Sequence, residues 1–272
     1  IPATMPDGQG QVAHFDLASA ERIEVLRGPF SVLYGNSSGG VIALFSAPVR
    51  AGRAEAGADV GSFGLRQLRA GAQAPLGHGL DLRVNLSKLQ IDGFRPQSEA
   101  ERELASVRLG WQGERDSVVL LGSDHRQEAQ DPLGLSPADF AADPRQTFAD
   151  ALSAKYNTRK TIRQSQGGVN WRHRFGDAGA LRETSLTAYL GSRGVTQFLA
   201  IAPTTQRNPA VPSSRRHGGG VVDFDRAYDG VEARARFGWD GVDAVVGVAH
   251  ERQRDERRGY ENFLGEPTAP TA

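Results

Sequence analysis

The sequence predicts an all-β protein, and three features of the chain indicate this fold. After residue 48, apolar and polar residues alternate over long stretches, as they do in strands whose two faces meet different surroundings. The connections between these stretches are short and long in turn. The three tryptophans all fall on the apolar side of a stretch, just before a short connection.

The composition narrows the class of protein without identifying it. The chain has 272 residues, no cysteine and a formal net charge of zero. This neutral balance implies no bulk attraction to nucleic acid or to acidic lipid. No apolar run approaches the roughly 18 residues that a membrane-spanning helix needs. A transmembrane β-barrel is expected to lack such runs, because only alternate residues face the lipid.

The first 48 residues are predicted to form a separate, tightly turned unit. Residues 2–10 have the composition of a loop, and Asp16 is placed to cap a single helical turn that runs to Glu21. Two strands are expected, at 21–26 and 41–45, on either side of a glycine-rich bend. We place the domain boundary near residue 48, where the two-residue periodicity begins.

Nine strands are expected after this boundary, near residues 53–61, 65–75, 80–91, 104–113, 117–127, 165–175, 182–198, 221–238 and 243–255. In the third of them, Leu80, Leu82 and Val84 alternate with polar residues, which gives the strand one apolar face. The longest connection contains Ser136 and Pro137 in positions that start a short helix.

Short turns on one rim and long loops on the other are typical of outer-membrane barrels. Trp111, Trp171 and Trp239 would then form an aromatic girdle at the rim with the short turns. The alternative is three core tryptophans in a water-soluble β-sandwich or adhesin-type binding protein, whose strands also alternate.

The residues that could carry chemistry do not form an enzyme or a metal site. Residues 35–39 match the turn that holds a serine nucleophile, Ser37, but an apolar strand follows where that motif requires a helix. The six histidines are scattered, without the spacing of metal ligands. The basic stretch from Lys155 to Arg174 has three interpretations: a solvated loop that runs into a lumen-lined strand, a nucleic-acid contact, and a vestibule that attracts an anionic solute.

Several sequence blocks resemble one family of proteins. Residues 21–29 read ERIEVLRGP, residues 33–35 read LYG and residues 39–42 read GGVI. These blocks, together with residues 1–9, resemble the end of the plug domain of TonB-dependent outer-membrane transporters. Further blocks at 131–135, 156–164, 217–221 and 258–263 resemble the subgroup that includes the transporter for pyrroloquinoline quinone.

The resemblance implies a plug domain that ends at residue 48 and, from residue 49 to residue 272, the first part of a plugged transmembrane β-barrel. Such barrels have about 22 strands, so the chain is expected to be a fragment that ends in an outer loop after its ninth strand. The implied function is uptake of a scarce anionic solute, a ferric siderophore or a pyrroloquinoline quinone-like cofactor, across the outer membrane of a Gram-negative bacterium. TonB, with ExbB and ExbD, would supply the energy through a segment upstream of residue 1. Outer-membrane lipid is then a partner, nucleic acid is not, and no enzyme activity or bound cofactor is expected.

The resemblance and the basic loops together give the expected site residues. Ligand contacts are expected from the plug apex and from the loops, at Met5, Asp7, Gln9, Arg159, Lys160, Arg163, Arg215 and Arg216. A second set, Glu21, Arg22, Glu24 and Arg27, is expected to latch the plug to charged residues inside the barrel. The alternative for this second set is a row of solvated strand positions.

Overall fold

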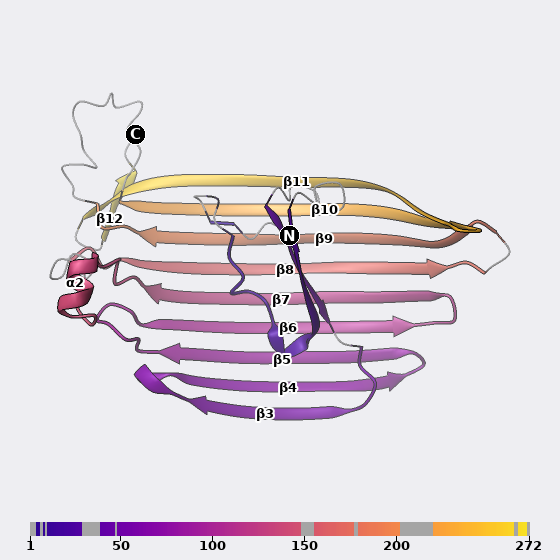
Figure 1. The fold of residues 1–272 in the computed structure, drawn as a ribbon, viewed down its shortest axis with the longest axis horizontal. Coiled ribbons are helices and arrows are strands. Elements are labelled where there is room, and N and C mark those ends of the chain that lie inside the picture. Colours follow the sequence, from indigo (N-terminus) through magenta and orange to yellow (C-terminus); the bar gives the residue numbers. More distant parts are fainter. Residues whose placement is uncertain are drawn as a thin grey trace, which may run out of the picture.

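The chain forms two separate antiparallel sheets (Figure 1). The structure, a computed structural model, describes residues 4–5, 8, 10–28, 39–46, 48–147, 155–176, 179–201, 220–263 and 266–270. The smaller sheet has two strands and the larger has ten, arranged in the order in which they follow along the chain. Within the described residues, no helix is long and apolar enough to cross a membrane.

The smaller sheet follows one short turn of helix. Asp16 caps the 3₁₀ turn η1 (Leu17–Ser19), as expected, but the turn ends before Glu21, which lies in the first strand. Strands β1 (Ala20–Arg27) and β2 (Gly40–Ser46) pair in an antiparallel register. Gly40 has a positive φ, and an added Cβ would lie 2.5 Å from the Leu26 carbonyl oxygen, so glycine allows the two strands to approach.

The larger sheet is a continuous meander in which each strand pairs with the next. Its strands are β3 (Arg53–Val60), β4 (Arg66–Gly77), β5 (Leu80–Ile91), β6 (Ala100–Gln112), β7 (Asp116–Gln130), β8 (Arg159–Arg174), β9 (Leu181–Phe198), β10 (Val221–Trp239), β11 (Val242–Phe263) and β12 (Glu266–Pro270). The helix α2 (Pro137–Ala142) starts at Ser136, whose side chain accepts a hydrogen bond from the Asp139 amide, as the sequence predicts.

All nine predicted strands are present, but several are longer than expected, and a tenth strand follows. Residues 100–103, 128–130, 159–164 and 256–263 were expected to be loop and are strand. The chain therefore does not end in a loop after its ninth strand, because β12 pairs with β11. The extensions all lie at the rim with the long connections, where the outer face is no longer apolar and the alternation that predicts strands is lost.

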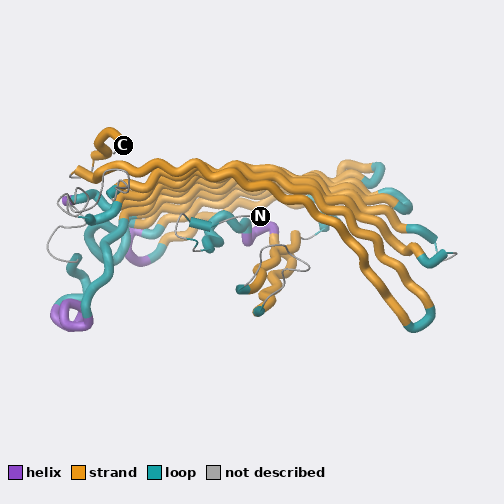
Figure 2. Tube along the Cα trace, turned by 90° about the horizontal axis from the view of Figure 1, so that it is seen from above, coloured by secondary structure: helices purple, strands orange, loops and turns teal. Residues whose placement is uncertain are grey.

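One face of the larger sheet contacts the N-terminal part of the chain. The described part of residues 4–19 (4–5, 8 and 10–19) and the smaller sheet lie together on this side, as the edge-on view shows (Figure 2). We call the face that meets residues 4–19 the inner face and the opposite face the outer face. The register places Gln127, Ile162, Val195 and Phe224 side by side on the inner face of strands β7 to β10.

The outer face is apolar toward the rim with the short turns. Trp111, Trp171 and Trp239 lie there at 39%, 37% and 54% exposure, so they are not core residues. Toward the rim with the long connections, the same face carries paired charges, such as Lys88 with Glu101 at 2.6 Å. This division is the pattern of a barrel wall whose strands extend beyond the hydrocarbon, and it does not fit the inside of a water-soluble sandwich.

Candidate functional site

The N-terminal segment inserts one apolar side chain into the inner face of the larger sheet. Met5 is 5% exposed and packs in a cluster with Ile162, Val195 and Phe224. These three wall residues sit on neighbouring strands in direct register. The unbranched thioether of methionine adapts to the irregular surface that they form.

Arg193, beside this cluster, joins the segment to the wall. Its side chain is 1% exposed, and its guanidinium donates hydrogen bonds to Gln164 on β8 and to Gln11 of the N-terminal segment. It also lies 3.5 Å from the Met5 sulfur. All three partners are neutral, so the positive charge has no carboxylate against it in these contacts.

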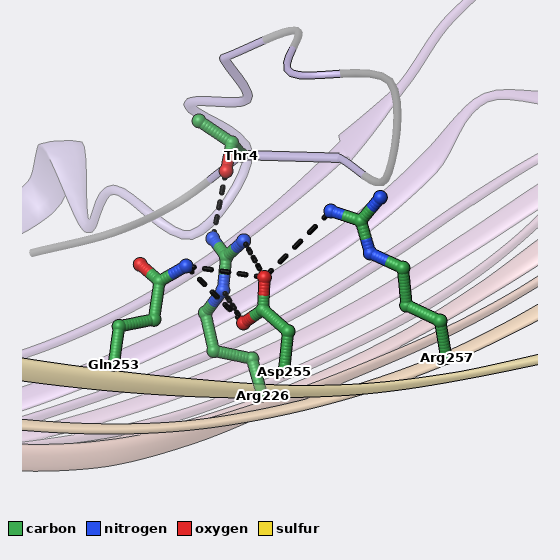
Figure 3. Close-up of polar contacts among 5 residues, drawn as sticks. All are labelled: Thr4, Arg226, Gln253, Asp255 and Arg257. Atoms are coloured by element: carbon green, nitrogen blue, oxygen red, sulfur yellow. Dashed lines mark hydrogen bonds and ion pairs between the residues drawn. The ribbon is translucent and has the colours of Figure 1, made fainter.

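A second arginine, Arg226, makes a similar contact from the next strand, β10, where it is in register with Arg193, and here the charge is compensated (Figure 3). Arg226 donates to both carboxylate oxygens of Asp255, at 2.8 and 3.0 Å, and to the Thr4 hydroxyl at 2.7 Å. Gln253 and Arg257 also reach the Asp255 carboxylate. A bidentate ion pair of this kind fixes the orientation of the guanidinium, which then positions Thr4.

Two further contacts lie closer to the rim with the short turns. The Asp16 carboxylate accepts hydrogen bonds from Asn85, at 2.8 Å, and from the Ser106 hydroxyl. Arg83, which is held by Gln73, donates to the Ser19 carbonyl oxygen at 3.3 Å. The segment is therefore attached to the inner face along much of its length.

His14 is buried between these contacts. Desolvation, with smaller contributions from the charges of Arg193 and His125, lowers its pKa to about 4. The His14 ring is therefore neutral near pH 7. Its Nδ1 atom has no hydrogen-bond partner among the described residues.

The structure separates the residues expected to contact a solute. Met5 is in the interface, and Lys160 lies on the inner face of β8, in the same parity as Ile162. Arg159 and Arg163 have the opposite parity and lie on the outer face, where Arg159 stacks over Phe198 at 3.6 Å. Asp7, Gln9, Arg215 and Arg216 lie outside the described residues.

The four residues expected to act as a latch are all in β1, and the structure shows contacts of two of them, Arg22 and Glu24, within the smaller sheet. Arg22 pairs with Glu24 at 2.9 Å and lies over the Phe45 ring at 4.3 Å. No contact of Glu21 or Arg27 with the wall is present among the described residues, and their latch role stays a prediction.

The other chemical motifs of the sequence do not form a site in the described part of the chain. Ser37, the candidate nucleophile, falls outside that part. Among the described residues there is no group of three or more histidine, aspartate or glutamate side chains that could hold a metal ion. In the basic stretch from Lys155 to Arg174 the expected strand is present as β8, but it begins at Arg159, so the loop part of the stretch is shorter than expected.

Sequence reasoning missed the residues that attach the segment to the wall, Thr4, Gln11, Arg193 and Arg226. For Arg193 and Arg226 the signal is a polar residue at an inner position of a strand, which the alternation does give, whereas Thr4 and Gln11 precede the first strand. Many wall positions share that signal, and only the register and the path of residues 4–19 select these from the rest.

The comparisons with known proteins agree with this geometry. The TonB-dependent receptor plug domain family matches residues 1–41. A metal-pseudopaline receptor, CntO of Pseudomonas aeruginosa, is 33% identical over 113 residues, a match that covers 40% of this chain and 16% of that receptor.

Solved structures match over almost the whole chain. The ferric citrate transporter FecA has a TM-score of 0.69 at 16% identity, and the copper transporter OprC has a TM-score of 0.70 at 17% identity. These alignments cover 94% and 98% of this chain but 38% and 40% of the two transporters. The chain therefore spans less than half the length of the proteins that it resembles.

The matched proteins are receptors and transporters and not enzymes, and they place the chain in the outer membrane of a Gram-negative bacterium. Residues 1–41 belong to the TonB-dependent receptor plug domain family, and the chain as a whole has the fold of part of the matched transporters.

Proposed function

We propose that the complete protein is a TonB-dependent transporter that takes up a scarce anionic solute across the outer membrane. Residues 1–48 would be the latter part of its plug and residues 49–272 the first part of its barrel wall. The observation that carries this proposal is the attachment of residues 4–19 to one face of a sheet whose other face is apolar. A plug inside a membrane barrel requires this division of the two faces.

The solute that we propose is a metal complex or cofactor with carboxylate groups, such as a ferric siderophore or a pyrroloquinoline quinone-like molecule. The names of similar proteins support this class, since they include a metal-pseudopaline receptor and a ferric citrate transporter. The inner face supports it as well, because Arg193 places positive charge 3.5 Å from the Met5 sulfur and Lys160 lies on the same face, two residues from Ile162. Cationic side chains of this kind bind carboxylates through charge-assisted hydrogen bonds.

Within the described residues, Met5 and Lys160 are the proposed solute contacts. Met5 would lie at the floor of the entrance, and Lys160 is next to the rim with the long loops, from which a solute would enter. Arg159 and Arg163 are poor candidates because they lie on the outer face. Asp7, Gln9, Arg215 and Arg216 keep their proposed role on the sequence resemblance alone.

Energy for release would come from TonB with ExbB and ExbD, acting on the plug. Binding at the outer rim alone cannot concentrate a scarce solute inside the cell, so a coupled movement of the plug is required. The wall contacts of Thr4, Gln11, Asp16 and Ser19 would then have to break in each cycle.

The test is uptake by the complete receptor in a Gram-negative host that lacks its own receptors. Ferric citrate, a panel of other ferric siderophores and pyrroloquinoline quinone would be supplied at limiting concentration. We expect uptake of one of these solutes, only in cells with TonB, and a several-fold lower rate at limiting solute for Lys160→Ala because one cationic contact is lost.

Arg163→Ala is the matched control, since it removes a cation three residues away on the opposite face of the same strand. Uptake that continues without TonB, or no uptake of any solute, would contradict the proposed transport. Equal effects of the two substitutions would contradict the role of Lys160.

A further inference from the structure

Buried polar atoms without partners collect at one place between the plug and the wall. Among the described residues, the buried side-chain nitrogen and oxygen atoms that lack a hydrogen bond belong, with the exception of Arg108 Nε, to five residues. These are His14, Arg102, His125, Gln127 and Arg193. Such atoms are rare in folded proteins, because each one costs free energy unless something binds it.

These five residues are neighbours in the fold. His125 on β7 is in register with Gln164 on β8, which is in register with Arg193 on β9. Gln127 lies two residues further along the same face of β7 and is in register with Arg102 on β6. His14, from the plug, lies close enough to Arg193 and His125 for their charges to lower its pKa.

The cluster carries positive charge that no carboxylate compensates. Arg193 contacts only neutral groups, and Arg102 has no ion pair or hydrogen bond among the described residues. The acidic residues on either side of Arg102 in the sequence do not compensate its charge. Alternation places Glu101 and Glu103 on the outer face, where both pair with Lys88.

The cluster is buried to different degrees. His125 and Arg193 are each 1% exposed, and both ring nitrogens of His125 lack partners. Arg102 is only part-buried and lines a cavity of about 530 Å³ between residues 15–18 of the plug and strands β3 to β6. The carboxylates beside that cavity have other partners, since Glu55 pairs with Arg53 and Asp16 bonds to Asn85.

We propose that His14, Arg102, His125 and Arg193, which lie between the plug and strands β6 to β9, form a binding site for carboxylate or phosphate oxygens. The Nε–H groups of Arg102 and Arg193 and the imidazole N–H groups donate hydrogen bonds. An anion accepts hydrogen bonds from such groups, whereas a metal cation does not. The two guanidinium charges also disfavour a cation. The claim that this site binds the carboxylates of a solute during transport rests on the proposed function. The claim that it binds an anion does not.

The test is calorimetric titration of the complete receptor in detergent with citrate and, separately, with inorganic phosphate. We expect saturable binding of citrate and at least a ten-fold loss of affinity in Arg102→Gln. Arg102 is the residue to change because it has no partner to lose. Arg163→Gln removes a charge from the outer face and is the matched control, with unchanged affinity expected.

The two anions separate two sources of the ligand. Tighter binding of citrate assigns the site to the carboxylates of a solute, and tighter binding of phosphate assigns it to a free anion; either supports the site. No saturable binding of either anion, or an affinity that Arg102→Gln leaves unchanged or that Arg163→Gln lowers equally, would overturn it.

A loss of folding is recognised separately. Thermal unfolding of Arg102→Gln is expected to match that of the unaltered receptor, and Arg102→Lys, which keeps the charge, is expected to retain part of the affinity. If Arg102→Gln unfolds early and Arg102→Lys binds no better, the role of Arg102 is structural and the proposal is wrong. Absent anion binding with intact uptake refutes this site alone, whereas anion binding without uptake of any solute refutes transport alone.

Discussion

Two buried arginines, Arg193 and Arg226, hold the plug in different ways. Arg226 is neutralised by Asp255 and donates its remaining hydrogen bond to Thr4. Arg193 bonds to Gln11, Gln164 and Met5, all without charge. Breaking the first contact leaves an intact ion pair in the wall, whereas breaking the second leaves a bare charge that attracts an anion.

Docking of the plug is expected to weaken in acid because of His14. Its pKa is about 4 in the docked plug and near 6.5 in water, so the undocked state binds more protons between these values. The contribution of neutral His14 to the free energy of docking is complete above about pH 6.5 and is lost as the pH falls toward 4. At about pH 5 the loss is on the order of 2 kcal/mol.

This pH effect can be measured by denaturant unfolding of the plug in the complete receptor. The midpoint for the unaltered protein is expected to fall between pH 7 and pH 5. His14→Gln removes the titrating group and should reduce this fall, whereas substitution of His78, which is exposed in the turn after β4, should not. The same pH dependence in His14→Gln would contradict the assignment.

At the scale of strands, the sequence predicts those parts of each strand in which apolar and polar residues alternate. From Leu80 to Trp111 the apolar positions locate β5 and β6 closely at the rim with the short turns. At the other rim the prediction fails, as in residues 159–164 and 256–263, because charged pairs such as Arg258 with Asp223 replace the apolar side. The strands continue to pair there, but the outer face is no longer apolar, so the sequence shows no alternation from which a strand could be predicted.

The candidate site was less predictable than the strands. Met5 was named from the resemblance and is buried in the interface, and Lys160 has the inner parity. Arg163 could have been excluded by counting from Trp171, which has the same parity and is apolar. His14 and His125, which lie far apart in the sequence, carry no local signal, since only the docking of the plug brings them together.

A charge in the middle of the outer face of β6 is expected to destabilise the receptor. Val107 lies midway between Trp111 at one boundary and Glu103 at the other, and it is 44% exposed. Val107→Arg should cost about 2–4 kcal/mol in the free energy of unfolding from lipid vesicles. Thr161→Arg, on the same face near the loop rim, should cost less than about 1 kcal/mol. Equal costs would show that the outer face does not meet hydrocarbon along its apolar part.

At the scale of the whole molecule, the plug explains why the two faces of one sheet differ. The sheet is polar where residues 4–19 lie against it and apolar on the opposite side, and both N-terminal elements lie on the polar side (Figure 2). Such a sheet is stable only with different surroundings on its two faces. A barrel that encloses a plug and is embedded in lipid supplies both.

The most direct test measures which face meets lipid, with single cysteines introduced into the complete receptor after replacement of any cysteine outside this segment, which itself has none. Val107→Cys and Ser106→Cys are adjacent on β6 but point to opposite faces, and Ser106 bonds to Asp16 of the plug. With a fluorophore on each cysteine and nitroxide-labelled lipids in the bilayer, strong quenching is expected at position 107 and little at position 106. Equal quenching at the two positions, or stronger quenching at position 106, would contradict the account.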